Sequence, residues 1–291
     1  MRRLIQSLLA ILSLLAAWPA LAGEDANQGK LLLTGGVSTV EGAGGGGLAT
    51  WATTTGYGTR DGYGANVHAA YVGVGDFSLQ TYGVAAAWRD RLEVSYARQR
   101  FDTGDTGAKL GLGRGFTFDQ DVFGAKLRLF GDAIYDQDRW TPQVAVGIQY
   151  KHNDQGAVIH AIGGKGDSGV DYYVAATKVL LNQGLVLNTT LRATKANQIG
   201  ILGFGGDRSN AYSIQSESSA AVLLNRHLAV GVEYRTKPDN LGFAHESDWF
   251  DVFGAYALNK HLSLTAAYVD LGDIATFRHQ RGAYISLQGG F

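Results

Sequence analysis

The sequence has 291 residues, of which 41 are glycine, 3 are proline and none is cysteine. Without cysteine the chain cannot form disulfides, thiolate metal sites or a lipidated cysteine anchor. The formal net charge of −1 gives no support to nucleic-acid binding. The 14 tyrosines, 12 phenylalanines and 5 tryptophans argue against disorder, and the glycines lack the Gly-X-Y period of collagen.

Residues 1–22 have the pattern of a secretory signal peptide. Two arginines precede an apolar run, and Ala20-Leu21-Ala22 supplies a small-x-small cleavage site. A retained membrane anchor is the alternative, but the run is shorter than the ~20 residues that span a bilayer, and Pro19 interrupts it. The sequence therefore predicts a chain that leaves the cytoplasm and is cleaved after Ala22, with residues 23–291 as one domain.

The rest of the chain shows segments about ten residues long in which apolar and polar residues alternate. Such alternation is typical of strands with one lipid-facing and one water-facing side, and ~9–11 residues cross a bilayer obliquely. We expect fourteen strands; twelve is the alternative, because glycine and alanine blur the faces of the first four. The predicted strands are 30–39, 48–57, 64–73, 77–88, 91–102, 118–130, 141–152, 170–181, 185–196, 211–224, 228–237, 247–258, 262–271 and 282–291.

The connections between these segments alternate in length. Residues 181–185, 224–228 and 258–262 are three versions of one tight turn, in which Asn follows an apolar residue and Leu resumes the strand. Residues 88–92 form a related turn, and the intervening connections are longer and polar. This pattern predicts an all-β fold: a transmembrane antiparallel up-and-down β-barrel of 12–14 strands, with short periplasmic turns and longer extracellular loops. A soluble β-sandwich, the alternative, would not require such alternation.

The last strand, residues 282–291, resembles the closing strand of Gram-negative outer-membrane β-barrels. Phe291, Leu287 and Ile285 lie on its apolar face, and the aromatic residue occupies the last position. The resemblance implies that these three residues form an assembly signal that the barrel-assembly machinery reads. We expect the strand to close the barrel against the first predicted strand, 30–39.

The amino-terminal part carries a second resemblance. Gly29-Lys30-Leu31-Leu32-Leu33-Thr34-Gly35-Gly36-Val37, the glycine-rich run 41–48 and the segment 97–103 are similar to a family of secreted Gram-negative proteins, domain of unknown function family 3034. The resemblance covers nearly the whole mature chain and implies one barrel domain, with no catalytic residues to carry over. The glycine run lacks the Gly-Lys-Ser/Thr ending of a phosphate loop. It permits a tight loop, a close approach of backbones or a fold into the lumen.

Charged residues collect on the face of the strands that should point into the barrel. A basic group and an acidic group follow one another along neighbouring strands, which would set up a transverse field across a water-filled lumen. This predicts a porin-like passive channel for small polar or anionic solutes. The alternative is that the charges pair in a non-conducting barrel that has a structural or ligand-binding role. The predicted lumen-lining residues are Lys126, Arg128, Lys151, Lys178, Arg192, Glu217, Glu233 and Asp251.

The seven histidines are scattered and show no zinc-ligand spacing. His68, on a predicted lumen face, is the only candidate for a third hypothesis, an outer-membrane lipid-modifying enzyme. His227 and His261 occupy equivalent turns, which suggests a structural role. We therefore expect no enzyme activity, cofactor or metal, and expect outer-membrane lipid, the assembly machinery and small polar solutes as partners. The sequence does not indicate an oligomeric state.

Overall fold

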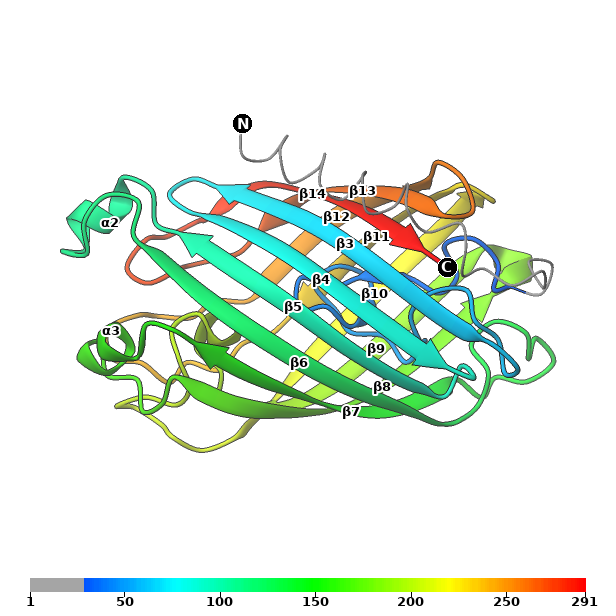
Figure 1. Ribbon diagram of the computed structural model, residues 1–291, viewed down its shortest axis with the longest axis horizontal. Coiled ribbons are helices and arrows are strands. Elements are labelled where there is room, and N and C mark those ends of the chain that lie inside the picture. The colour runs from blue at the N-terminus through cyan, green and yellow to red at the C-terminus, as the bar shows by residue number, and fades with distance from the viewer. Residues whose placement is uncertain (1–28) are drawn as a thin grey trace.

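A computed structural model describes residues 29–291, so the predicted signal peptide lies outside the described residues. Twelve antiparallel strands close into a barrel in which sequence neighbours pair and the last strand pairs with the first (Figure 1). The strands are β3 Tyr63–Val74, β4 Ser78–Trp88, β5 Leu92–Asp102, β6 Thr117–Phe130, β7 Gln143–Asn153, β8 Ser168–Leu180, β9 Leu185–Thr194, β10 Ser213–Asn225, β11 Leu228–Arg235, β12 Trp249–Ala257, β13 Leu262–Asp270 and β14 Arg281–Gly290.

Residues 29–62, which we call the plug, enter the barrel instead of joining its wall (Figure 1, blue segment). The plug contains only the two-residue strands β1 Val37–Ser38 and β2 Gly44–Gly45, which pair with each other. The strands predicted over 30–39 and 48–57 are therefore wrong, and twelve is the correct number. Their alternation is weak because glycine, alanine and threonine dominate the segment.

The predicted partner of the last strand is also wrong. β14 pairs with β3, placing Ile285 opposite Tyr71, and not with residues 30–39. The predicted up-and-down order of antiparallel strands is still correct, because a closed antiparallel barrel needs an even number of strands and twelve is even.

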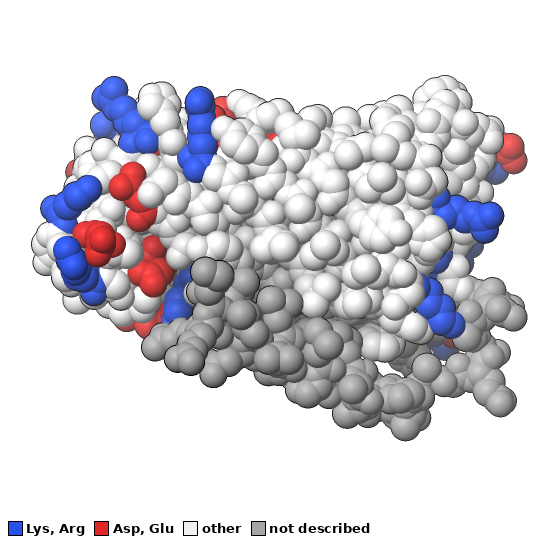
Figure 2. Space-filling model, turned by 90° about the horizontal axis from the view of Figure 1, so that it is seen from above, with Lys and Arg blue, Asp and Glu red and all other residues white. Residues whose placement is uncertain are grey.

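The strands are two-sided, as the period of two predicts. Along β12, buried and exposed positions alternate almost throughout. On the face that Figure 2 shows, Lys, Arg, Asp and Glu gather toward the two ends, and the middle carries none. Exposed apolar side chains of the strands form a belt around the barrel. This belt and the closed barrel are the features of an outer-membrane β-barrel. Exposed members of the belt include Val84, Val94, Ile148, Val174, Leu187, Leu191, Val230, Val232, Val252 and Ile285.

The two ends of the barrel differ. At the turn end lie the short turns 181–184, 226–227 and 258–261; the loop end carries the helices α2 Thr106–Lys109 and α3 Gly156–Ala161 and the turn η2 Asn197–Gly200. Two connections depart from the rule: 131–142 is long although it lies at the turn end, and 75–77 is short although it lies at the loop end. None of the helices within residues 29–291 is long and apolar enough to cross a membrane.

The Asn-centred turns have the predicted local chemistry. The side-chain Oδ1 of Asn225 accepts a hydrogen bond from the backbone N–H of His227 at 2.8 Å, and Asn259 Oδ1 accepts from His261 N at 2.7 Å. The Nδ1 atoms of His227 and His261 lie 3.0 and 3.1 Å from backbone carbonyls at the ends of β12 and β14. Both histidines therefore tie a turn to a neighbouring strand, which is a structural role.

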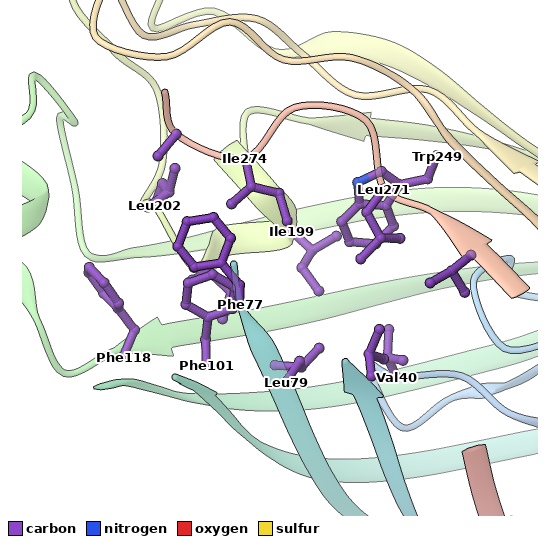
Figure 3. Close-up of a cluster of buried hydrophobic side chains, with 14 of the residues drawn as sticks. Val40, Phe77, Leu79, Phe101, Phe118, Ile199, Leu202, Trp249, Leu271 and Ile274 are labelled. Carbon is purple, nitrogen blue, oxygen red and sulfur yellow. The ribbon is translucent and has the colours of Figure 1, made fainter. Parts of the chain in front are cut away.

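An apolar cluster fills the loop end, and we call it the loop-end cluster (Figure 3). It joins inward side chains of the wall, such as Phe101 and Leu79, to loop residues such as Leu202 and Ile274. The plug reaches it through Val40 and Leu48. The rings of Phe77 and Phe101 stack with centroids 5.2 Å apart. Apolar contacts thus close this end together with polar ones, such as the buried ion pair of Lys237 with Glu246 at 3.0 Å.

Candidate functional site

The eight residues that we predicted to line the lumen all lie on inward-facing positions of the wall, and none is more than 7% exposed. They are not free to meet solutes, because the plug occupies the space that they surround. The site is therefore the contact between the plug and the inner wall.

Glu41 is the centre of this contact. It is the one acidic residue among residues 26–60 of the sequence, and it is fully buried. One carboxylate oxygen accepts from Lys151 Nζ, and the other accepts from Arg235 Nη1 at 2.6 Å. Arg192 Nη2 lies 3.9 Å from the same oxygen as Arg235. A single plug residue therefore bridges β7, β9 and β11.

Two carboxylates of the wall complete this network. Asp171 Oδ2 lies 2.6 Å from Lys151 Nζ and 3.5 Å from Arg192 Nη1. Glu217 Oε1 lies 2.5 Å from Arg192 Nε and 3.5 Å from Arg235 Nε. With Glu41, three acidic groups thus face three basic groups, so the formal charge of the network is zero. Removal of Glu41 would leave one positive charge in excess.

A second buried ion pair, Lys126 with Glu93, binds the glycine-rich part of the plug. Lys126 Nζ lies 3.1 Å from Glu93 Oε1 and donates to the carbonyl oxygens of Gly44 at 3.0 Å and Thr53 at 2.8 Å. Glu93 accepts from the backbone N–H of Gly44 at 3.1 Å and of Thr55 at 2.7 Å. These bonds satisfy plug backbone groups that would otherwise be buried without a partner.

The remaining plug backbone is bonded in the same way. Glu233 Oε2 accepts from Leu48 N at 2.7 Å, and Glu217 Oε2 accepts from Thr50 N at 2.8 Å. A Cβ atom on Gly46 would lie 2.0 Å from Glu233 Oε1, so glycine is required for this approach. Of the roles considered for the glycine run, the fold into the lumen is the one observed. Further bonds to the plug come from Gln99, Gln143, Thr177, Asn188, Thr190 and Ser219.

Arg128 and Lys178 serve the turn end and not the centre of the lumen. Arg128 pairs with Asp90, which also lies 2.8 Å from Lys30 Nζ of the plug. Lys178 Nζ donates to the backbone carbonyl of Asp136, in the long turn 131–142. The predicted basic residues therefore have two roles: Lys126, Lys151 and Arg192 bind the plug inside the barrel, and Arg128 and Lys178 bind groups at the turn end.

The turn 131–142 is organised by Asp132. Its Oδ1 accepts from the backbone N–H of Ile134 at 3.0 Å and of Tyr135 at 2.8 Å, and Arg128 Nη2 lies 3.3 Å from Oδ2. Burial raises the pKa of Asp132, but the two N–H donors and Arg128 together hold it below its usual value. The Tyr135 hydroxyl then reaches the carbonyl of Gly29 at 3.3 Å, which joins this turn to the plug.

Glu233 and Asp251 face one another across β11 and β12, and neither forms an ion pair with any residue of 29–291. Glu233 accepts from the plug and from Ser219 Oγ at 2.6 Å. Oδ1 of Asp251 has no hydrogen-bond partner in the described chain. The acidic part of the predicted lining is thus divided: Glu217 is paired with Arg192 and Arg235, whereas Glu233 and Asp251 have no basic partner in the described residues.

A family model described as "Protein of unknown function (DUF3034)" matches residues 34–288. The chain belongs to this family. The match spans both the plug and the barrel wall, so the two parts are features of one family domain. Sequence comparison with curated proteins found no match.

Solved structures share the fold at low sequence identity. The NanC porin superposes with a TM-score of 0.50 at 10% identity, over 77% of this chain and 98% of that chain. The KdgM porin gives a TM-score of 0.50 at 8% identity, over 78% and 99%. A structure of KdgM in complex with disordered oligogalacturonate gives 0.51 at 8% identity, over 78% and 99%. These likenesses show that the chain has an outer-membrane barrel fold.

His68 is buried on the inner face of β3 at 2% exposure. Neither of its ring nitrogens has a hydrogen-bond partner in residues 29–291, and a Cβ on Gly83 would lie 2.2 Å from its Cε1. Within the described residues, therefore, no hydroxyl group is hydrogen-bonded to His68 as the nucleophile of a catalytic pair would be. The described residues also contain no group of three or more acidic or histidine side chains that could hold a metal ion.

The predicted assembly signal lies at the turn end of β14. Ile285 is 45% exposed on the lipid face, and the ring of Phe291 stacks on His261 with centroids 5.3 Å apart. The carbonyl oxygen of Phe291 accepts from Tyr57 N at 2.9 Å and from Ala65 N at 3.0 Å. The last residue thus contacts the plug, the first barrel strand and the last turn.

The sequence analysis missed Glu41, Glu93, Asp171 and Arg235. The sequence could have indicated that such partners exist. Lys126, Lys151 and Arg192 were predicted to face inward, and buried cations require acidic partners, which the sequence analysis did not name.

Proposed function

We propose that this protein is a porin-like outer-membrane channel for small polar solutes, and that the plug is the part of the chain that closes it. The observation that carries the proposal is that a separate chain segment fills the lumen. The wall reaches this segment through charged and amide side chains that water could solvate equally well. With the plug displaced, the wall would surround a polar, water-filled lumen.

The likeness to porins supports a channel, and KdgM has been solved with disordered oligogalacturonate. For this chain, preference for anions depends on Glu41. When Glu41 leaves with the plug, Lys151, Arg192 and Arg235 face only Asp171 and Glu217, so this part of the wall carries one positive charge in excess.

The test is conductance in planar bilayers, comparing the intact chain with a variant that lacks residues 30–57. Heat-modifiable gel migration first establishes that both samples contain folded barrels. We expect large, anion-preferring steps from the deletion variant and smaller or rarer steps from the intact chain. A folded deletion variant without conductance steps would overturn the proposal.

A non-conducting envelope barrel is the second candidate, and the loop-end cluster favours it, because apolar residues close the mouth. This candidate predicts that the intact chain never conducts at any applied voltage. It also predicts that loop residues bind a ligand while the plug stays in place.

A further inference from the structure

The plug is bonded to one side of the barrel only. Inward side chains of β5 to β11 hold it through the ion network and the backbone bonds described above. β14 and β3 contribute Gln288 and Asn66, which both bind Ser38 near the turn end, at 2.6 and 3.0 Å. Within residues 29–291, no hydrogen bond joins the plug to a side chain of β4, β12 or β13. We call the inner face of β12, β13, β14, β3 and β4 the seam; within residues 29–291 its side chains bond the plug only at Ser38.

Polar groups of the seam are buried without partners. Both ring nitrogens of His68, Oγ1 of Thr81, Oδ1 of Asp251, the hydroxyl of Tyr284 and Oγ of Ser286 have no hydrogen-bond partner in the described chain. A buried polar atom without a partner has lost its water and gained nothing in return. Unpartnered atoms also occur on the bonded side, at Gln120 Oε1 and Gln149 Nε2, but both of these side chains make other hydrogen bonds. The seam, where His68, Thr81 and Ser286 make none, is therefore the side of the contact that gains most from hydration.

The two ends of the seam have different barriers. At the turn end a cavity of ≈ 20 Å³, about the volume needed for one water, lies between plug residues such as Leu33 and Thr55 and the wall residues Asn66, Ser263 and Gln288. At the loop end the apolar contacts of Val40 and Leu48 with the loop-end cluster close the seam. An apolar constriction of this kind blocks ions by excluding water.

Asp251 is a buried carboxyl group of the seam without an ion partner, and it becomes negatively charged when water enters and the group ionises. Asp251 lies opposite Glu233 on the neighbouring strand, and like charges at such positions repel. The basic residues that contact the plug lie on the bonded side, where Lys126, Lys151, Arg192 and Arg235 each have an acidic partner. A cation that entered the seam would relieve the repulsion, whereas an anion would add to it.

We propose that the passage in the intact protein opens along the seam, while the plug stays bonded to β5–β11, and that it prefers small cations and uncharged polar solutes to anions. This inference rests on the proposed channel function. It makes Asp251 the residue that sets charge preference, and it makes the loop-end cluster the gate. It also predicts opposite charge preferences for the intact chain and for the plug-deleted variant.

Cysteine labelling tests the route, because the chain has no cysteine of its own. Ser286→Cys places a thiol in the seam, and Ser219→Cys is the matched control on the bonded side, where Trp51 Nε1 donates to Ser219 at 2.9 Å. Both positions are nearly inaccessible, at 2% and 5% exposure, so their labelling rates report opening. We expect a cationic methanethiosulfonate reagent to modify Ser286→Cys roughly tenfold faster than Ser219→Cys, and faster than an anionic reagent does. Thr81→Cys repeats the test if Ser286→Cys does not fold.

Reversal potentials in a salt gradient test the charge preference. Asp251→Asn should weaken cation preference in the intact chain, while Asp105→Asn, an exposed change on a loop, should not. Equal labelling of Ser286→Cys and Ser219→Cys would mean that the whole plug leaves, and would overturn the seam. If the protein conducts but its seam cysteines do not react, the seam is not the route, and the proposed channel function is unaffected. Faster labelling of the seam in a folded protein that never conducts would uphold seam opening and reject the channel.

Discussion

Arg235 of β11 donates a hydrogen bond from Nη1 to Glu41 Oε2 at 2.6 Å, across 194 positions of the sequence. With Lys151 on its other oxygen, Glu41 holds the plug to both sides of the bonded wall. Glu41 is therefore the plug residue on which we expect the position of the plug to depend most.

Replacing Glu41 by Gln should loosen the plug, because three buried cations would then face only two carboxylates. Breaking one partner from a buried ion pair costs about 3–5 kcal/mol. We expect a lower unfolding midpoint and more frequent conductance steps in bilayers. Asp61→Asn, an exposed change in the same segment, is the control. Unchanged stability and conductance in Glu41→Gln would show that the network does not hold the plug.

Lys151 and Lys178 should differ when each is replaced by Met. Lys151→Met leaves Glu41 and Asp171 without their shared cation and should destabilise the fold by about 3–5 kcal/mol. Lys178 binds carbonyl oxygens of the turn 131–142, so its loss should cost about 1–3 kcal/mol. Denaturant unfolding followed by gel migration measures both. Equal losses, or a change in ion selectivity without loss of stability, would contradict this assignment.

Deleting Phe291 should impair membrane insertion while leaving secretion intact. The residue joins the last turn through His261, and it joins β3 and the plug through its carbonyl oxygen. The measurement is the fraction of heat-modifiable barrel in outer-membrane preparations. His261→Ala, which removes only the ring contact, should have the smaller effect. A normal barrel fraction in the deletion variant would show that Phe291 is not an assembly signal.

His68→Ala should leave lipase assays unchanged. The imidazole lies in the seam and makes no hydrogen bond to a hydroxyl group of the described residues, so it is not arranged to activate a nucleophile. His152→Ala, at an exposed position of β7, is the control. Loss of lipid hydrolysis in His68→Ala alone would establish the enzyme that we do not expect.

The turn 131–142 should loosen in acid. Because the pKa of Asp132 is lower in the folded state than in the unfolded chain, its stabilisation is present above the ordinary carboxyl pKa, roughly 3.9, and is lost as the pH falls through the lowered pKa. Protease protection of this turn, measured against pH, should fall in that window. Asp132→Asn should be less protected and should lack the pH step. A step of the same size in Asp132→Asn would assign the effect to another group.

The barrel wall was predictable because each of its strands separates an apolar lipid environment from a polar interior. Val230 and Val232 face lipid and Glu233 faces inward for one reason, a period of two between an apolar and a polar environment. The Asn-centred turns were predictable because Asn side chains bond the backbone two residues further on. These are local rules, which a sequence displays directly.

The plug was not predictable in the same way. The weak alternation of apolar and polar residues in the plug resembles that of a strand. The conformation of the plug depends on side chains distant in sequence, such as Glu93, Glu217 and Glu233, which accept hydrogen bonds from its backbone. Pairing across the lumen, such as Glu41 with Lys151, follows from three-dimensional closure and has no local sequence pattern. The glycine run indicated close approach, but not which wall it would approach.

Both ends of the plug lie at the turn end. Lys30 donates its backbone N–H to the carbonyl oxygen of Tyr57 at 3.1 Å, so the segment enters the barrel and returns through the same opening. Residues 30–57 are therefore not threaded through the barrel, and their withdrawal would break no hydrogen bond of the ladder that closes β14 on β3. Wall and plug are topologically independent. The topology therefore sets no barrier of its own to a movement of the plug, which has only to exchange side-chain bonds for bonds to water.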